Sequence, residues 1–207
     1  MKSFKTFSGI AAPLIRVNID TDAIIPSREI KTVSKKGLSG GLFAEWRYLS
    51  LESRKENPDF ILNQDPFKKA SILVTGNNFG CGSSREHAVW ALGEWGIRAI
   101  IAPSYGSIFY SNCIKNGILP IVMDGRVISS MSEFIKENPE ENRLTVNLIK
   151  NEVSYSNEVT ETFVIQKQDK EFLINGLDQI EQTLQKNSII NEFETLHKKT
   201  NPWLNAS

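Results

Sequence analysis

The segment with the clearest chemical potential covers residues 76–87 and reads GNNFGCGSSREH. An apolar, β-branched run at 71–75 precedes it, and apolar periodicity predicts a helix over 83–95. The pattern indicates a buried strand, a glycine-rich turn and a helix N-terminus, where free N–H groups and the helix dipole bind anions. Such groups can stabilise an alkoxide on Ser83, and the guanidinium fork of Arg85 suits a carboxylate.

Ser83 and Glu86 also fit the S-x-x-E spacing of a capping box, with Ser83 as the N-cap and Glu86 as the N3 residue. Local sequence leaves capping alone and an anion-binding or catalytic role both open. A dinucleotide-binding turn is disfavoured, because Arg85 stands where the third glycine of G-x-G-x-x-G belongs. The sequence also contains no G-K-S/T of a Walker phosphate loop.

Other reactive side chains lie near this turn and near the N-terminus. Cys81 and His87 could form a nucleophile pair, although a buried thiol and a packed imidazole are commoner outcomes. His197 lies near the end of the chain, where we expect it to be solvated. Asp20 and Asp22 would share a face of an extended chain and could ligate a metal, but no third ligand lies nearby, and turn or cap duty is commoner.

Composition excludes several function classes. The chain has 207 residues with 24 Lys and Arg against 24 Asp and Glu, so it lacks the basic excess of a general nucleic-acid binder. No apolar run approaches the ~20 residues that span a bilayer, and we expect a cytoplasmic protein. The two cysteines, Cys81 and Cys113, are too few for an iron–sulfur site. We therefore expect no metal site in this chain and any cluster on another chain.

Alternating apolar runs and helical stretches must position the 76–87 turn. Strands are predicted at 71–75, 97–102 and 118–122, with helices between them at 83–95 and 107–116. Glycines at 96 and 117 are expected to end the two helices. The strand–helix–strand order predicts an α/β fold with a parallel sheet and right-handed crossover helices.

The flanking segments are predicted in less detail. The N-terminus should form a strand, a turn at 12–13 and a second strand over 14–19, and residues 42–50 should contain a helix. After residue 123 we expect part-helix at 124–142, antiparallel strands at 144–149, 152–155 and 162–166, and helices at 178–184 and 189–196. We predict one domain over 1–207: a core with the active-site loop at 1–123, C-terminal strands and helices at 124–197, and a loosely held tail at 198–207.

Two motifs carry a family resemblance, NIDTDAIIP at 18–26 and NFGCGSSREHA at 78–88. Together they resemble the small subunits of bacterial 3-isopropylmalate dehydratases, members of the aconitase superfamily. The match continues through residues 42–48, 101–104, 108–113, 116–120 and 173–180, and so spans nearly the whole chain. It implies a swivelling β/β/α domain with a mostly parallel central sheet and a β-rich C-terminal portion, the free-standing counterpart of the C-terminal domain of aconitase.

The resemblance also implies an activity and a set of roles. The family isomerises 2-isopropylmalate to 3-isopropylmalate in leucine synthesis, by removing water and adding it back at the neighbouring carbon. A 4Fe-4S cluster on a large-subunit partner acts as the Lewis acid, so this chain would be active only in a heterodimer or higher complex. The implied catalytic base is Ser83, with Ser84 and Arg85 holding a carboxylate of a small dicarboxylic acid, and with Asp22, Gly82 and Glu86 in support.

The resemblance places substrate specificity in the loop after Pro26. Ile30, Lys31 and Thr32 are the matching substrate-binding residues, with Ile30 suited to an isopropyl group and Lys31 to a carboxylate. Glu29 departs from the aromatic residue that relatives usually carry, and it is either a solvated loop residue or a specificity residue. Two alternatives stay open: another small-acid dehydratase subunit of the citraconate, methylmalate or homoaconitate type, and a non-catalytic anion-binding module.

Overall fold

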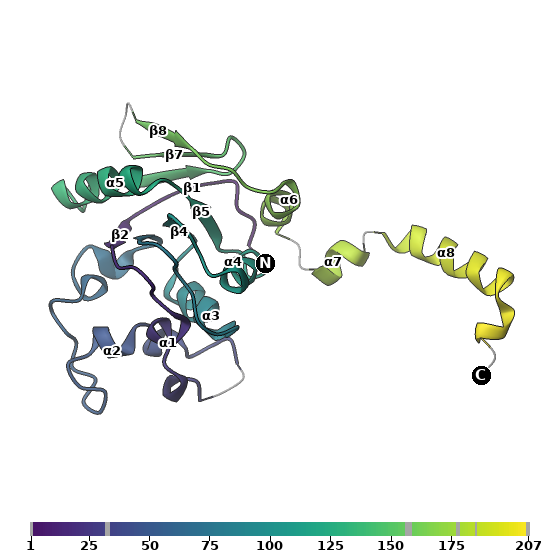
Figure 1. Ribbon diagram of the computed structural model, residues 1–207, viewed down its shortest axis with the longest axis horizontal. Helices are drawn as coiled ribbons and strands as arrows, with labels where there is room; N and C mark the ends of the chain where they lie inside the picture. The colour runs from purple at the N-terminus through teal and green to yellow at the C-terminus, as the bar shows by residue number, and fades with distance from the viewer. Residues whose placement is uncertain (1, 32–33, 156–158, 177–178, 185, 206–207) are drawn as a thin grey trace.

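Two four-stranded sheets organise the protein (Figure 1). This computed structural model describes residues 2–31, 34–155, 159–176, 179–184 and 186–205. The parallel sheet has the order β2-β3-β4-β5, and its strands are β2 (Ala11–Leu14), β3 (Ile72–Thr75), β4 (Ala99–Ala102) and β5 (Leu119–Val122). The antiparallel sheet has the order β1-β6-β7-β8, and its strands are β1 (Thr6–Gly9), β6 (Leu144–Asn147), β7 (Glu152–Ser154) and β8 (Thr160–Thr162).

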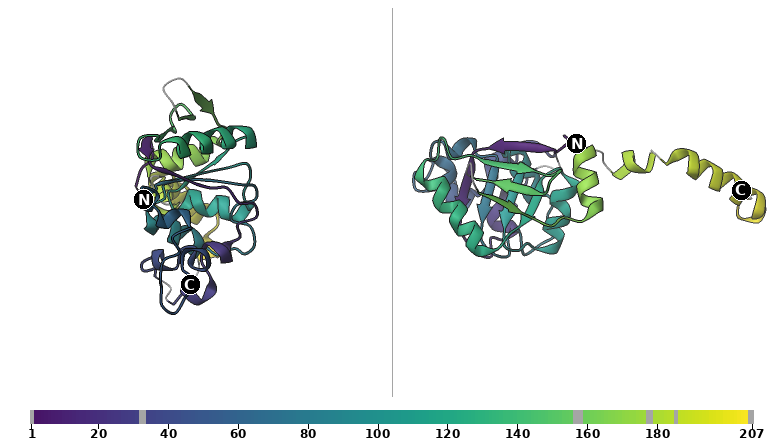
Figure 2. Two further views of the ribbon diagram at one scale, coloured as in Figure 1. Left: turned by 90° about the vertical axis from the view of Figure 1, so that its left-hand side faces the viewer. Right: turned by 90° about the horizontal axis from the view of Figure 1, so that it is seen from above.

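Helices cover the parallel sheet on both sides. α3 (His87–Trp95) and α4 (Ser107–Lys115) lie on one side, and α5 (Gly125–Glu137) packs against β2, β3 and β4 on the other, toward the antiparallel sheet (Figures 1 and 2). The other helices in the described part of the chain are α1 (Thr21–Ile24), α2 (Ala44–Arg47), α6 (Lys167–Asn175), α7 (Gln179–Leu184) and α8 (Asn187–Thr200). This arrangement confirms the predicted α/β class with a parallel sheet.

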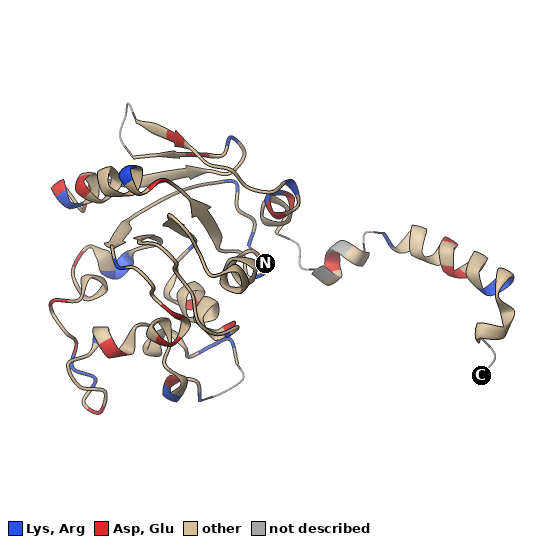
Figure 3. Ribbon diagram, viewed as in Figure 1, with Lys and Arg blue, Asp and Glu red and all other residues tan. Residues whose placement is uncertain are grey.

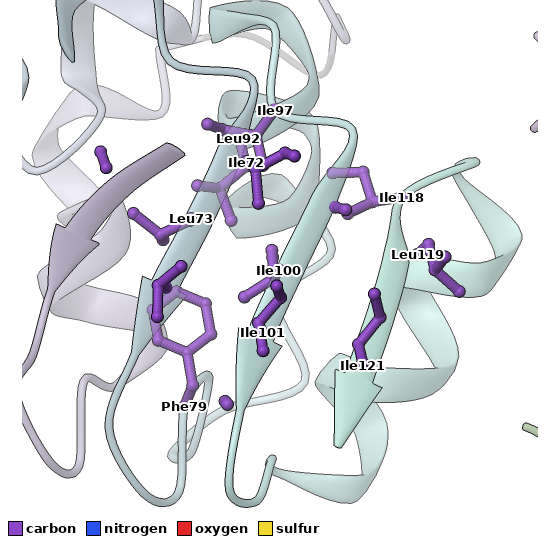
Figure 4. Close-up of a cluster of buried hydrophobic side chains, with 14 of the residues drawn as sticks. Ile72, Leu73, Phe79, Leu92, Ile97, Ile100, Ile101, Ile118, Leu119 and Ile121 are labelled. Atoms are coloured by element: carbon purple, nitrogen blue, oxygen red, sulfur yellow. The ribbon is translucent and has the colours of Figure 1, made fainter. Parts of the chain in front are cut away.

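The main core lies between the parallel sheet and its helices. Every residue of β2, β3 and β4 is buried, as expected for parallel strands covered on both faces. Figure 4 shows aliphatic side chains of three neighbouring strands and of α3 packed together, including Ile72, Leu73, Leu92, Ile100, Ile101, Leu119 and Ile121. The apolar runs that predicted the three strands are therefore the residues that hold the sheet to its helices.

The predicted helix ends at Gly96 and Gly117 are confirmed. Gly96 has φ +114, and Leu92 O accepts N–H bonds from Gly96 and from Ile97, which ends α3 in the left-handed conformation that glycine favours. Gly117, at φ +77, likewise follows α4. β4 begins three residues after Gly96, and β5 begins two residues after Gly117.

The predicted N-terminal turn at 12–13 is wrong. Ala12 and Pro13 lie inside β2, with Pro13 opposite Val74 of β3. β2 is the outermost strand of its sheet, and such a strand tolerates proline because its outer edge needs no N–H donor. The strand expected over 14–19 ends at Leu14, and the chain then runs irregularly to α1.

The C-terminal third differs from prediction in three places. α6 was not predicted; it buries Phe172 and Leu173 and ends at Gly176, whose φ is +66. The last strand, β8, begins at Thr160 and ends at Thr162, the first residue of the 162–166 segment expected for it. α8 is longer than the predicted 189–196 helix and takes in part of the expected tail, and a 3-10 turn follows at Pro202–Asn205. α6 forms although its sequence is mostly polar, because Phe172 and Leu173 are buried and Gly176 ends the helix.

Candidate functional site

Residues 76–86, here called the reactive loop, follow the carboxyl end of β3, and α3 begins only at His87. Ser83 is therefore not the N-cap of α3, and the predicted capping box is wrong. Gly80 and Gly82 take positive φ values of +71 and +94, a conformation that glycine adopts without strain, so this segment is a turn and not the first turn of α3. Glu86 does not return to the N–H of Ser83, because its Oε1 accepts a 2.7 Å bond from Asn116 Nδ2.

The loop is held by a segment about sixty residues earlier in the chain. Thr21 N–H donates to Cys81 O at 2.9 Å, and Ser83 N–H donates to Thr21 Oγ1 at 3.2 Å. The two hydroxyls, Thr21 Oγ1 and Ser83 Oγ, lie 3.0 Å apart. Thr21 is only 2% exposed, whereas Ser83 is exposed. The buried threonine thus fixes both the backbone and the hydroxyl of the exposed serine.

Thr21 is a site residue that the sequence reasoning missed. Its only signal was its position between Asp20 and Asp22 in the first motif. The structure explains the neighbours as well. Asp20 caps α1, since its Oδ1 accepts N–H bonds from Asp22 at 3.0 Å and Ala23 at 2.7 Å. The two carboxylates therefore do not form a metal face, and the cap role is confirmed for Asp20.

Asp22 pairs with Arg85 across the same junction. Asp22 Oδ1 bonds Arg85 Nη1 and also accepts 3.3 Å bonds from the N–H and the hydroxyl of Ser27. The hydrogen bond from Arg85 chiefly lowers the pKa of Asp22, and the backbone bond from Ser27 adds to that effect. An ionised Asp22 therefore holds the guanidinium of Arg85, which follows Ser83 and Ser84 in the same loop.

Gly80 allows the loop to pack closely against the core. Its N–H donates to Ile19 O at 2.7 Å, and a Cβ added here would lie 2.1 Å from the ring of Phe109. Phe79 packs edge-on against Phe109 at 5.3 Å between ring centroids. Any larger residue at position 80 would move this buried pair and the loop with it.

The remaining reactive candidates have structural roles. Burial, and next the charge of Asp20, raise the pKa of the Cys81 thiol, which disfavours the thiolate that a nucleophile needs. His87 lies against the ring of Trp90, at 4.7 Å between centroids. Cys113 is fully buried in α4. Among the residues that the structure describes, no group of three His, Cys, Asp or Glu side chains could hold a metal ion.

Comparison with known proteins identifies the family. Residues 1–126 match the model of the aconitase C-terminal domain. The small subunit of 3-isopropylmalate dehydratase from Cupriavidus necator is 47% identical over 204 residues, which cover 99% of this chain and 98% of that protein. The Leptospira interrogans small subunit is 46% identical, with all of both chains covered. This chain belongs to the 3-isopropylmalate dehydratase small-subunit family.

A solved structure supports the same conclusion for the fold. The 3-isopropylmalate dehydratase of Methanocaldococcus jannaschii matches 91% of this chain and 99% of its own, with a TM-score of 0.62 and 27% sequence identity. Family membership and this match confirm the predicted resemblance and the swivel-domain fold of the aconitase superfamily. They do not favour a non-catalytic anion-binding module.

In this small-subunit family member, the loop after Pro26, where the resemblance places substrate specificity, is anchored at its start. The Glu29 side chain is only 8% exposed, and its Oε2 lies 2.5 Å from Arg54 Nη2. That hydrogen bond is the main reason why the pKa of Arg54 is raised. Glu29 is thus no solvated loop residue, and that interpretation is wrong. The following Ile30 is half-buried against the core and Lys31 is exposed, whereas Thr32 lies outside the described residues.

A second anchor holds the far side of this loop to α3. The carboxylate of Glu94 accepts backbone N–H bonds from Gly37 at 2.6 Å, Leu38 at 2.5 Å and Ser39 at 2.7 Å. Burial alone raises the pKa of Glu94, but these N–H donors lower it by more, so its net pKa lies below the ordinary value. α3 therefore follows the 76–86 loop at its N-terminal end and binds the 37–39 backbone through Glu94 near its C-terminal end.

Proposed function

We propose that this chain is the small subunit of an enzyme that isomerises 2-isopropylmalate to 3-isopropylmalate by dehydration and rehydration in leucine biosynthesis. Support comes from small subunits of that dehydratase that are 44–48% identical over 97–100% of their length. The observation that carries the proposal is the exposed Ser83 hydroxyl, bonded to buried Thr21 and next to the Arg85–Asp22 pair.

Ser83 is the proposed base that takes the proton from the substrate carbon. A serine hydroxyl is a weak base at neutral pH unless its alkoxide is strongly stabilised. Thr21 Oγ1 accepts the N–H of Ser83 and lies 3.0 Å from Ser83 Oγ, so once Ser83 has lost its proton the Thr21 hydroxyl is the group that can donate to the alkoxide. In this proposal the alkoxide is stabilised by Thr21 and by the nearby Arg85 charge, rather than by the N-terminus of α3.

The other proposed roles follow from the same geometry. Arg85 uses Nη1 for Asp22, which leaves Nη2 and Nε as the donors proposed for a substrate carboxylate, together with Ser84. Gly82 provides the turn that presents Ser83. The supporting role proposed for Glu86 is to fix the start of α3 through Asn116. In the specificity loop, Ile30 would contact the isopropyl group and Lys31 a carboxylate, and Thr32 is the third residue proposed to bind the substrate.

We further propose that the cluster and the cellular setting are those of the family. A 4Fe-4S cluster, which supplies the Lewis acid, would be held by the large subunit, because the two cysteines of this chain include the fully buried Cys113. No helix within the described residues is long and apolar enough to cross a membrane. We propose a cytoplasmic complex in which residues 1–207 act as one swivelling domain; its division at 123 and 197 stays a prediction.

The decisive experiment combines the chain with its large subunit and substitutes Ser83→Ala. Loss of a group that stabilises or forms the reacting oxyanion costs about 10²–10³ in kcat, and loss of the base itself should cost at least that. Ser129→Ala is a matched control, because the hydroxyl of this exposed serine donates within its own helix, to Gly125 O of α5. Turnover of 2-isopropylmalate is measured for both variants, with the unfolding temperature as a fold check. Near-normal turnover of Ser83→Ala would remove Ser83 from the mechanism.

A substrate profile tests the remaining alternative in the same preparation. Methylmalate-type and homoaconitate-type substrates are compared with 2-isopropylmalate by kcat/KM. A preference for 2-isopropylmalate supports the proposal. A clear preference for either of the others would assign this chain to another small-acid dehydratase and would give buried Glu29 a part in that difference.

A further inference from the structure

The described C-terminal residues 179–184 and 186–205, here called the C-terminal arm, stand away from the rest of the protein. The arm contains α7, α8 and the 3-10 turn at Pro202–Asn205 (Figures 1 and 2). No residue of α8 is buried. The arm therefore adds nothing to either sheet or to the main core, although it is folded into helices.

The arm exposes large apolar side chains on nearly every turn. Seven are between 60% and 71% exposed: Ile180, Leu184, Ile189, Phe193, Leu196, Trp203 and Leu204. In α8, residues 189, 193 and 196 have the i, i+4, i+7 spacing that places them in one stripe. Asn191 lies on the opposite face. The helix thus has the two-sided pattern of an element that packs against something.

The arm lacks the apolar packing that normally stabilises a helix in a protein. An isolated helix shorter than about 12–15 residues is marginal in water, and most helical stability in proteins comes from packing of the apolar face. α8 has 14 residues and packs no apolar side chain into the core. With seven large side chains about two-thirds exposed, covering the arm would bury on the order of 800 Å² of apolar surface. One partner in a standard protein interface contributes about that area.

We propose that the C-terminal arm is the element by which this small subunit docks onto an apolar groove of its large subunit. The inference rests on the proposed function, which requires a cluster-bearing partner. The relatives compared above are small subunits by name, and 98–100% of each aligns with 99–100% of this chain. An arm of this length therefore lies within the part that this chain shares with proteins named for belonging to a larger complex.

Two other possible partners of the arm, a second copy of this chain and a membrane surface, fit less well. A second copy of the arm would offer the same three-residue stripe of α8, and that stripe does not include the apolar side chains of α7 and of Pro202–Asn205. A helix that binds a membrane surface carries a basic polar face, whereas α8 mixes Glu192 and Glu194 with Lys198 and Lys199 (Figure 3). A groove in a second, larger protein can cover the whole arm.

The test measures the affinity of the full-length small subunit for its large subunit. Phe193→Asp places a charge in the apolar stripe, and Asn191→Asp places the same charge on the opposite face of α8. We expect the dissociation constant to rise at least tenfold for Phe193→Asp and to stay unchanged for Asn191→Asp. At saturating large subunit, Phe193→Asp should regain the wild-type kcat, because the arm contributes no residue to the Ser83 site.

Two results would overturn the inference. One is an unchanged dissociation constant for Phe193→Asp. The other is a dimer of the isolated small subunit that Phe193→Asp converts to a monomer, because the arm would then pair two copies. The proposed function fails separately: a wild-type complex that forms through Phe193 but does not isomerise 2-isopropylmalate would refute the activity and leave the docking role in place.

Discussion

The contact between Thr21 and Ser83 predicts how substitutions of Thr21 change kcat. Thr21→Val keeps the shape of the buried side chain and removes its hydroxyl, whereas Thr21→Ser keeps the hydroxyl. The hydroxyl lies 3.0 Å from Ser83 Oγ. A neutral hydrogen bond contributes about 0.5–1.5 kcal/mol and one to a charged group about 1.5–3, so the alkoxide state should lose about 1–2 kcal/mol more than the resting state. That difference lowers kcat by about 5- to 30-fold in Thr21→Val.

The assay is isomerase activity of the assembled complex as a function of pH, with the unfolding temperature of each variant. Losing the donor raises the pKa of the Ser83 hydroxyl, so the rising limb of the rate profile should move to higher pH in Thr21→Val. Thr21→Ser should restore both kcat and the profile. A purely structural role would instead lower the unfolding temperature and leave the profile in place. Equal impairment of the two variants, or wild-type kcat in Thr21→Val, would refute the reasoning.

Two further predictions concern the loops that carry the site. In Gly80→Ala the new Cβ would lie 2.1 Å from the Phe109 ring at φ +71, so left-handed strain and overpacking should together cost about 2–5 kcal/mol of unfolding free energy. Gly82→Ala, with no atom closer than 3.4 Å, should cost only about 1–2 kcal/mol, and equal losses in denaturant titrations would contradict this account. Because the pKa of Glu94 lies below its ordinary 4.5, the stability that its ionised form gives through the 37–39 loop is present above about pH 4.5 and is lost as pH falls through the lowered value. Glu94→Gln should therefore flatten the fall in unfolding free energy below pH 4.5, and an unchanged slope would show that the three N–H bonds do not depend on charge.

Much of the central architecture could be predicted from local sequence. The strands at 71–75, 97–102 and 118–122 are apolar on both faces, so only a covered parallel sheet satisfies them. Gly96 and Gly117 mark the helix ends, because the backbone takes the left-handed conformation at those points and glycine adopts it most easily. α6 escaped prediction because its sequence is mostly polar, and only the burial of Phe172 and Leu173 reveals its inner face.

The start of α3 shows where local sequence stops being sufficient. The S-x-x-E spacing is compatible with a capping box, yet Glu86 bonds Asn116, thirty positions away in the chain. Ser83 bonds Thr21, 62 positions away, and Glu29 is buried by Arg54, 25 positions away. No window of one helix or turn contains both partners of such a pair, so the outcome depends on which segments the sheet brings together.

The sheet order explains why these partners meet. β2 and β3 are parallel neighbours in register, with Leu14 opposite Thr75, so the segments that follow them leave the same edge of the sheet. The pairing resumes at the bridge between Asp20 and Cys81. Beyond that bridge, Thr21 bonds Ser83 and Asp22 bonds Arg85. The predicted turn at 12–13 excludes the pairing of β2 with β3. A predicted strand through Pro13 would have placed the 18–26 and 78–88 motifs side by side. The proposed base is thus positioned by strand pairing, and the edge strand β2 is as much a part of the site as the reactive loop.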